Sequence, residues 1–435
     1  MPRRSTMGPV PLRPSPSPLG RSPRAAQRAI IPPVRIAAIG GVLAAGLMLA
    51  CQEPEPEPTP PSSTSDAAPP LAAPAPLEAP DPTQDERTEP RPASTTRPSI
   101  LDLAFVGDIV LGEYVFDDHR SLAGPASDHD PFSRVADSLR ADLLIGNLES
   151  PVMREVPEHS PLRFGHRFGG SAAAVDALAA AGFDVMSVAN NHANDLGRPG
   201  LEQTPAILGA AGLLAAGAAR HEGSVFRVET LEHAGWRIGF LSAATWLNNA
   251  PAPGDPAIPL ARTGALTDAL VPKIRAARAE HDLLVVLLHW GRERREEPGF
   301  VQVNAAHDLV DAGADLVIGH HPHVLQGIER YGDGLIAYSL GNFLFPARVH
   351  EFRDTGILHV RWNVETRCPA GATFEALRLD RALGHGPRPT TARERRTILD
   401  RIQRLSRSLR THWHEQDETM VLAGCEPTPP PPKEQ

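Results

Sequence analysis

The fold of this chain is decided by the stretch ADLVIGHHPH, residues 314–323. Its first five residues are mostly apolar and are followed by Gly319, which is the pattern of a short strand buried in a parallel sheet. Open α/β sheets bind ligands beyond the carboxyl ends of their strands, where the three histidines would emerge. Neutral imidazole is a common metal ligand. The stretch therefore predicts a metal site, with a helix-capping or solvent-facing histidine cluster as the alternative.

Four more strand-like runs end at polar residues in the same way. They cover residues 101–106, 142–145, 183–189 and 282–288. Segments with helical spacing lie between the predicted strands, at residues 132–140, 172–181, 201–211, 268–280 and 303–312. This alternation predicts βαβ units and a parallel sheet. Because the carboxyl ends of parallel strands meet at one edge of a sheet, we expect the polar residues that follow them to converge.

The polar residues beyond these strands form a mixed oxygen and nitrogen set. The candidate metal ligands are Asp108, Asn147, Glu149, Asn191, His289, His321 and His323. Such a set suits Mn, Fe, Zn or Mg rather than a metal that selects thiolates. It is large enough for two divalent ions, which lie roughly 3.5–4 Å apart in sites that clamp the attacking and leaving oxygens of a displacement.

Two further residues have candidate roles beside the ions. His192 directly follows Asn191, so it cannot point at the same ion and is predicted to protonate a leaving group. A purely structural histidine is the alternative. Arg292 stands just after the strand-end residue His289 and is a candidate contact for an anionic substrate, with a solvated arginine as the alternative.

Several longer motifs carry a family resemblance over about residues 100 to 365. They are GD at 107–108, NLE at 147–149, ANNHANDLG at 189–197, HWG at 289–291, GHHPHV at 319–324 and SLGNF at 339–343. The chain resembles the CapA family of capsule and poly-gamma-glutamate synthesis proteins, whose domain is similar to the calcineurin-like metallophosphoesterases. The resemblance implies an α/β fold of the metallophosphoesterase-like type, a layered α-β-β-α sandwich.

The resemblance also assigns roles to residues of this chain. Asp108 would match the first metal-binding aspartate of the metallophosphoesterases, and His289 their single histidine. The Asn-His pair would be Asn191 with His192, and the His-x-His motif His321 with His323. His320 and Asn342, which lie within the motifs, are candidate substrate contacts.

The chain departs from the metallophosphoesterase pattern at two places. Ile109 and Val110 follow Asp108, so the usual Asp-x-His motif is incomplete. Asn147 or Glu149 stands where a bridging aspartate is expected. The number of ions and the residue that bridges them therefore stay open.

The first 51 residues have the features of an export signal. Residues 1–50 contain seven arginines and no acidic residue, and residues 36–50 are an unbroken apolar and glycine run. That run is shorter than the roughly 20 residues of a comfortable membrane span. Cys51 then resembles the lipidated cysteine of a bacterial lipobox, and an uncleaved anchor helix is the alternative. Either way we expect a membrane-anchored, extracytoplasmic protein.

The remaining sequence divides by composition. Residues 52–98 are rich in Pro, Ala, Glu, Ser and Thr and are predicted to be a disordered spacer, as is the tail at 426–435. The metallophosphoesterase-like domain is predicted over 99–365, with a C-terminal extension at 366–425. In that extension residues 391–410 have the pattern of an amphipathic helix that packs on the domain, or less favourably docks on an anionic surface.

Charge and cysteine content restrict the partners and the compartment. The net charge of −9 includes the basic signal, so the mature chain is more acidic still, which argues against nucleic acid as a partner. Cys368 and Cys425 are the only other cysteines. In an oxidising compartment they could pair, and two buried free thiols are the alternative.

Three functions fit these observations. The first is a role in assembling or exporting a capsule or poly-gamma-glutamate type polymer, together with synthesis and export proteins, as the resemblance implies. The second is a metallophosphoesterase-like hydrolase of a phosphoester or related bond in the cell envelope, with His192 as acid. The third is a non-catalytic module in which the histidines hold a structural ion or a polymer end. The fold alone does not choose between them.

Overall fold

The computed structural model describes residues 97–425 except 116–117, 124–129, 163–165, 222, 348 and 382–383. The predicted signal with Cys51, the spacer up to residue 96 and the tail at 426–435 lie outside the described residues.

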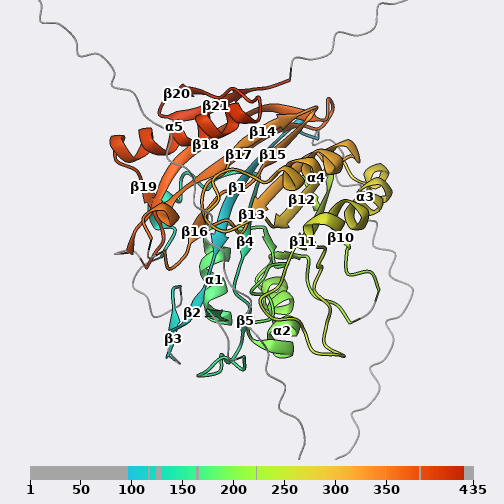
Figure 1. Cartoon of the computed structure of the whole chain (residues 1–435), viewed down its shortest axis with the longest axis vertical. Coiled ribbons are helices and arrows are strands. Elements are labelled where there is room, and N and C mark those ends of the chain that lie inside the picture. Colours follow the sequence, from blue (N-terminus) through green and yellow to red (C-terminus); the bar gives the residue numbers. More distant parts are fainter. Residues whose placement is uncertain are drawn as a thin grey trace, which may run out of the picture. The chain divides into compact units, whose positions relative to one another are not determined.

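The larger of two main β-sheets holds the N-terminal strands of the domain (Figure 1). Its strands are β1 (Ile100–Ile109), β4 (Leu143–Leu148), β8 (Val185–Ser187), β9 (Leu214–Ala216), β16 (Asn342–Leu344), β17 (Asp354–Asn363), β18 (Cys368–Leu379), β19 (Pro387–Pro389), β20 (His414–Gln416) and β21 (Thr419–Ala423). The order is β20-β21-β18-β17-β1-β4-β8-β9, with β16 beside β1 and β19 beside β18. β1, β4 and β8 are parallel, as predicted, and β9 adds a parallel strand that the sequence patterns did not predict. β17 to β21 add an antiparallel half that they did not predict either.

The second sheet holds the strands that end at the histidines. Its strands are β10 (Val228–His233), β11 (Trp236–Ala244), β12 (Leu283–His289), β13 (Leu316–His320), β14 (Ile328–Tyr331) and β15 (Gly334–Ala337). The order is β10-β11-β12-β13-β15-β14, and the four central strands are parallel. Short ladders join β2 (Gly112–Val115), β3 (Asp118–Ser121) and β6 (Arg167–Phe168), and β5 (Val152–Met153) with β7 (Gly170–Ser171).

The two sheets pack face to face, and helices cover their outer faces. The outer helices are α1 (Ala172–Ala180), α2 (Gly197–Ala210), α3 (Leu266–Ala277) and α4 (Phe300–Asp311), whereas α5 (Ala392–Ser408) packs against the core between the sheets. Phe105 of β1 and Val285 of β12 belong to one core between the sheets. The next residues along these strands, Val106 and Val286, face outward and pack with α1 and α3 respectively. This alternation, which follows from the period of two in a strand, confirms the predicted α-β-β-α layering.

The helical predictions are confirmed with one exception. Helices α1 to α4 cover four of the predicted segments within a few residues. Residues 132–140, however, form only a 3₁₀ turn at Ser133–Val135, so that helix prediction is wrong. The Asp130 carboxylate accepts a hydrogen bond from the backbone N–H of Phe132, and the Asp130 backbone carbonyl accepts one from the Ser133 hydroxyl. These bonds stabilise a turn that is tighter than an α-helix. Among the described residues, no helix has the length and apolar character needed to cross a bilayer.

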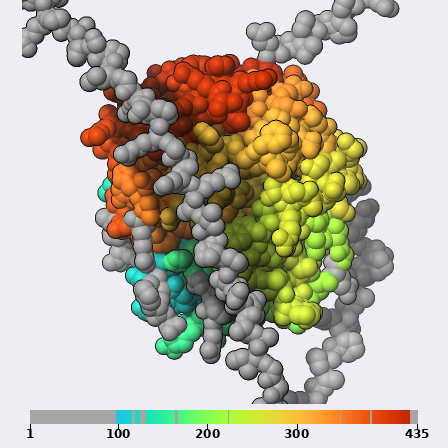
Figure 2. Space-filling view, viewed as in Figure 1, coloured from blue at the N-terminus to red at the C-terminus, as the bar shows by residue number. Residues whose placement is uncertain are grey.

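Helix α5 packs on the domain, as predicted for residues 391–410. Thr391 and Glu394 form a capping box at its start, and Ile398 and Ile402 are buried in the core between the sheets. The red C-terminal residues and the orange residues before them form one continuous surface in Figure 2. The apolar stripe of α5 is therefore used internally, which leaves it unavailable for docking on a membrane.

A disulfide joins the start of β18 to the segment after β21. Cys368 and Cys425 have Cα atoms 6.3 Å apart and are bonded through their sulfurs. Of the two alternatives left open by the sequence, the structure therefore has the paired form.

Glu394→Gln tests how strongly the start of α5 is held. The carboxylate pairs with the Arg388 guanidinium at 2.9 Å and accepts a hydrogen bond from the Thr391 backbone N–H. These contacts lower the Glu394 pKa to about 2, and the hydrogen bond from Arg388 is the largest cause. After allowance for solvent screening, we expect the variant to lose about 1 kcal/mol of unfolding free energy at pH 7. Because folding lowers this pKa, the ionised carboxylate stabilises the folded state fully at pH values above its normal pKa of 4.5. The difference in urea denaturation should therefore shrink as the pH falls from 4.5 towards 2. Glu365→Gln, at an exposed carboxylate, should change little at either pH.

Cys368→Ser tests the disulfide. The bond closes a loop with a sequence separation of 57 residues, so its removal should lower the free energy of unfolding by about 2–4 kcal/mol. Cys425→Ser should give the same loss, and a reductant should reproduce it in the wild type. A wild-type protein whose denaturation midpoint ignores reductant would contradict the pairing.

Candidate metal centre

Two neighbouring parallel strands supply the acidic side of the site. Asp108 on β1 lies in register with Asn147 on β4, and both side chains are fully buried. The Asn147 Nδ2 donates to Asp108 Oδ1 at 2.9 Å. Glu149 comes directly after β4 and is also fully buried. The close pairing of β1 and β4 therefore brings two carboxylates and an amide to one edge of the larger sheet.

The second sheet supplies the imidazoles. His289 is the last residue of β12 and lies in register with His320, the last residue of β13. His321 and His323 follow with φ angles of 97° and 58°, in the left-handed region that non-glycine residues rarely adopt. Such conformations cost about 1–3 kcal/mol and are concentrated at functional sites. They turn this loop so that the His289 and His321 rings lie 4.8 Å apart, and the His321 and His323 rings 5.7 Å.

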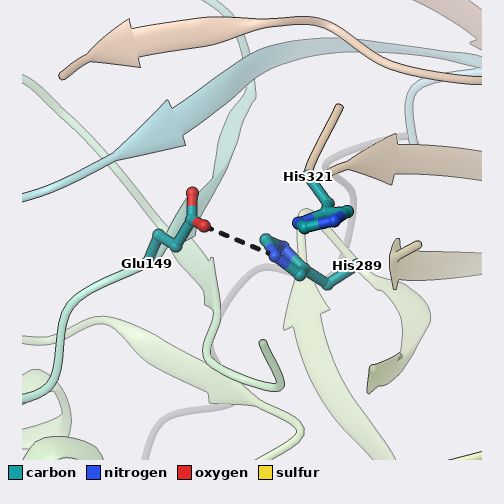
Figure 3. A group of neighbouring side chains, drawn as sticks. All are labelled: Glu149, His289 and His321. Atoms are coloured by element: carbon teal, nitrogen blue, oxygen red, sulfur yellow. Dashed lines mark ion pairs between the residues drawn. The ribbon is translucent and has the colours of Figure 1, made fainter. Parts of the chain in front are cut away.

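Side chains from both sheets form groups that can hold a metal ion. The three groups are Glu149 with His289 and His321, Asp108 with Glu149 and His323, and Glu293 with His321 and His323. In each group the ligand atoms lie within 4.8 Å of one another. Figure 3 shows the Glu149 carboxylate directed at the His289 ring, with the His321 ring beside it. The predicted ligands Asp108, Glu149, His289, His321 and His323 are therefore brought together.

Unpaired buried polar atoms show that this donor set fits a cation. Within the part of the chain that the structure describes, no hydrogen-bond partner exists for either Glu149 carboxylate oxygen, His289 Nε2, His321 Nδ1 or Asn191 Oδ1. Glu149 Oε1 and His289 Nε2 lie 3.4 Å apart but do not form a hydrogen bond. A buried unpaired polar group costs about 1–3 kcal/mol, and a bound divalent ion would satisfy several at once. Carboxylate, amide and imidazole donors suit Mn, Fe, Zn or Mg.

Burial and neighbouring charges set the protonation of the histidines. Burial, with the charges of neighbouring histidines, lowers the pKa of His289 well below its usual value and that of His321 to about 3. Both rings are therefore in the neutral form that binds metals. For His323, burial opposes the charge, but the Glu149 and Asp108 carboxylates outweigh it and raise the pKa to about 9.

The two carboxyls of the site also differ. Burial, together with the charge of Asp108, raises the pKa of Glu149 well above its usual value. Burial acts in the same direction on Asp108, but its interactions with His323 outweigh it and lower the pKa. The Asp108 Oδ2 lies 3.2 Å from His323 Nδ1, so these two residues form an ion pair in the metal-free chain.

His192 lies beside the metal-binding groups rather than in them. Its Nδ1 is 2.6 Å from Asp195 Oδ2, and its ring centroid is 4.2 Å from that of Phe168. It lines a cavity of about 270 Å³ together with His323. The neighbouring Asn191 donates through Nδ2 to Asn248 Oδ1 at 3.3 Å, which leaves its own Oδ1 unpaired among the described residues. This placement is compatible with the predicted proton transfer by His192, which stays a prediction.

The three predicted substrate contacts occupy different positions. Arg292 is exposed and lines a cavity of about 410 Å³ with His321. His320 is buried, with its Nε2 3.1 Å from the Val106 carbonyl oxygen. Asn342 is also buried, and its Oδ1 lies 2.9 Å from His323 Nδ1. The structure therefore brings only Arg292 to an open cavity, while His320 and Asn342 contact other protein groups.

Four residues of the site were not identified from the sequence. They are Asp195, Trp246, Asn248 and Glu293. Asp195 stands three residues after His192 in the same motif, so the spacing was a usable signal. Trp246, whose Nε1 donates to His321 Nε2 at 3.1 Å, follows the end of β11. No strand was predicted at β11, so the polar and aromatic residues after it were not among the candidate site residues.

Comparisons with known proteins agree with the site motifs. The family model described as "Bacterial capsule synthesis protein PGA_cap" matches residues 102–347. The chain is 31% identical over 284 residues to "Capsule biosynthesis protein CapA" of Bacillus anthracis, covering 60% of this chain and 64% of that protein. It is 31% identical over 292 residues to "PGA biosynthesis protein CapA" of Bacillus subtilis (strain 168), covering 64% and 72%.

The solved structures that match this chain share little sequence with it. A hypothetical protein from Thermus thermophilus has 18% identity and a TM-score of 0.34, with 67% of this chain and 96% of that chain covered. The sulfate thiohydrolase SoxB from the same organism has 13% identity and a TM-score of 0.36, with 63% and 56% covered.

Metal binding should stabilise the protein through the clustered ligands. With Mn²⁺ or Zn²⁺ at 100 times its dissociation constant, we expect the free energy of unfolding to rise by about 2.7 kcal/mol. His289→Ala or His321→Ala should remove most of this gain, measured as the shift of the melting temperature on metal addition. His221→Ala, at an exposed histidine outside the cluster, should keep it. Equal metal-induced shifts in all three variants would contradict the site.

Proposed function

Because the chain belongs to the family of bacterial capsule synthesis proteins, we propose that it acts in the synthesis or export of a capsule or poly-gamma-glutamate type surface polymer, through a metal-dependent site. The names of the two Bacillus relatives support the kind of polymer. The observation that carries the metal-dependent part is the set of buried donor atoms of Glu149, His289 and His321 that find no partner among the described residues.

The reaction that this site suits best is hydrolysis of a phosphoester or a related bond in a cell-envelope molecule. The carboxylates of Asp108 and Glu149 and the imidazoles of His289, His321 and His323 would hold divalent ions, with Asn191 as a further oxygen ligand. A bound ion supplies Lewis acidity and lowers the pKa of an attacking water. Because His289 and His321 are neutral, neither ring has to lose a proton before its nitrogen binds an ion.

His192 would transfer a proton to the leaving group. Its Nδ1 faces the Asp195 carboxylate at 2.6 Å, which orients the ring. The Nε2 is then the nitrogen available for the substrate, and the Asn248 amide lies 3.2 Å from it. Phe168 contacts the same ring and restricts its rotation. Proton transfer of this kind contributes about 10²–10⁴-fold to a rate.

The proposed place of action is outside the cytoplasm, on a membrane. The pairing of Cys368 with Cys425 supports an oxidising compartment, where disulfides persist. A lipid on Cys51, or an uncleaved anchor, would tether the chain, and residues 52–98 would hold the domain away from the bilayer. Polymer synthesis and export proteins are the proposed partners, and nucleic acid is not.

A non-catalytic role remains the second candidate. Val110 stands where metallophosphoesterases have the histidine of Asp-x-His, and it is fully buried, so this donor is missing from the site. With one imidazole fewer, the cluster would hold a structural ion or bind a polymer end. Turnover measurements on site variants separate this candidate from the hydrolase.

His192→Ala separates catalysis from metal binding. We expect metal-dependent turnover of phosphoester substrates to fall by about 10²–10⁴-fold, because the proton donor is lost, while the metal content stays at the wild-type level. Asn191→Ala should lower both, since it removes a ligand. His221→Ala serves as the control. If both site variants keep full turnover, the hydrolase proposal is abandoned and the binding module is favoured.

The polymer role is tested in the bacterium that makes the protein. Deletion of the gene should reduce the amount or length of an acidic surface polymer, and the wild-type gene should restore it. A gene with His289→Ala should fail to restore it at equal protein abundance, because the metal site is incomplete. An unchanged surface polymer in the deletion strain would rule out this role.

A further inference from the structure

Two cavities open on either side of the histidine loop. The first, which we call the arginine pocket, has a volume of about 410 Å³ and is lined by Thr245, Trp246, Thr263, Arg292 and His321. The second, the phenylalanine pocket, has a volume of about 270 Å³. Its apolar wall consists of Phe168, Phe345, Pro346, Val349 and Phe352, and its polar lining of Glu113, His166, His192, Arg294 and His323. Glu293 lines both.

Members of the metal-binding groups line both pockets. His321 lines the arginine pocket and His323 the phenylalanine pocket, and their ring centroids are 5.7 Å apart. Glu293 forms a metal-binding group with these same two histidines. A molecule whose reacting centre sits at the histidines therefore has room for a substituent on each side.

The arginine pocket suits a negatively charged, polar group. Among the described residues the Arg292 guanidinium forms no ion pair, and the one carboxylate that lines this pocket, Glu293, belongs to a metal-binding group. Thr245 and Thr263 add hydroxyl groups, and Trp246 adds an aromatic surface that is 41% exposed. Arginine recognises phosphate and carboxylate groups through paired hydrogen bonds.

The phenylalanine pocket suits a ring or a hydrocarbon group. The Phe168 and Phe345 rings meet edge to face with centroids 5.7 Å apart, and Phe345 also contacts the His323 ring. The Arg294 guanidinium lies 5.2 Å above the Phe352 ring, which extends the flat surface. Aromatic walls of this kind bind flat or apolar groups by burial of apolar area.

Residues 291–297, which contribute Arg292, Glu293 and Arg294 to the linings of the two pockets, are held by contacts with neighbouring elements. The Glu296 carboxylate pairs with Arg401 at 3.2 Å and with Arg404 at 2.8 Å, both on α5. The Gln326 Nε2 donates to the Arg295 carbonyl at 2.7 Å, and the Arg294 N–H donates to the Pro322 carbonyl at 2.9 Å. These contacts keep the pocket-lining residues of this loop in place.

We propose that the site takes a phosphodiester, with one substituent in each pocket, rather than a phosphomonoester. This inference rests on the hydrolase function proposed above. A monoester has one organic substituent and would leave one pocket empty, whereas a diester has two. The substituent in the arginine pocket carries a further negative charge, and the one in the phenylalanine pocket is a ring or a hydrocarbon.

The corresponding reaction balances as a hydrolysis. The oxygen of one water molecule forms a bond to phosphorus while one ester P–O bond breaks. The products are a phosphomonoester and an alcohol. The alcohol oxygen receives a proton from His192, and the proton lost by the water restores the histidine. No oxidant, reductant or second substrate is needed.

The test compares three probes on the full chain loaded with Mn²⁺ or Zn²⁺. They are p-nitrophenyl phosphate, a monoester, and thymidine 5′-(p-nitrophenyl phosphate), a diester, with and without an added 3′-phosphate. We expect kcat/KM for the plain diester to exceed that for the monoester by at least about tenfold, and the 3′-phosphate to raise it by about tenfold more. Arg292→Ala should lower kcat/KM for the 3′-phosphorylated diester by about tenfold more than for the plain diester.

The matched control is Arg396→Ala, which removes an exposed arginine of α5 that lines neither pocket, and it should behave as the wild type. A preference for the monoester, or an equal loss on both diesters in Arg292→Ala, would overturn the diester proposal while the hydrolase function stands. Absence of metal-dependent turnover with all three probes would overturn the hydrolase function and the diester proposal together.

Discussion

This structure depends on one constraint: ionisable side chains are buried where the edges of two sheets meet. Glu149 and His289 are fully buried, yet their carboxylate oxygens and Nε2 have no hydrogen-bond partner in the described chain. A fold retains such groups at a cost that a cation would offset. The backbone near the site is also closely packed. Gly319 of β13 lies so near the Tyr338 carbonyl oxygen that any side chain there would overlap it.

The layered architecture is what brings the ligands together. β1 and β4 deliver Asp108 and Glu149 from one sheet, and β12 and β13 deliver the histidines from the other. The apolar core between the sheets, which includes Phe105 and Val285, fixes the distance between these two edges. Because interiors are close-packed, a change of volume in this core would move the two halves of the site relative to each other.

The C-terminal segment contributes to the site although it follows the part of the chain that matches the family model, residues 102–347. β17 and β18 extend the larger sheet beside β1, and α5 buries its apolar stripe in the core. Through Glu296, Arg401 and Arg404 of α5 hold the loop at 291–297, whose residues line both pockets. The disulfide ties the end of this segment back to β18. Access to the proposed metal site is therefore shaped by residues far from it in sequence.

The sequence by itself determined five of the parallel strands, most of the helices and the ligand candidates, because a period of two or of 3.6 residues and a polar residue after a strand are local signals. Tertiary structure alone decided which of these side chains meet. His320 turns to the Val106 carbonyl while His321 faces the site, a choice made by strand pairing and by a left-handed backbone at His321. Asp130 converts the predicted helix at 132–140 into a tight turn. Glu293 and Trp246 join the site through a loop position and a strand end that no local pattern marks, since such contacts depend on long-range packing.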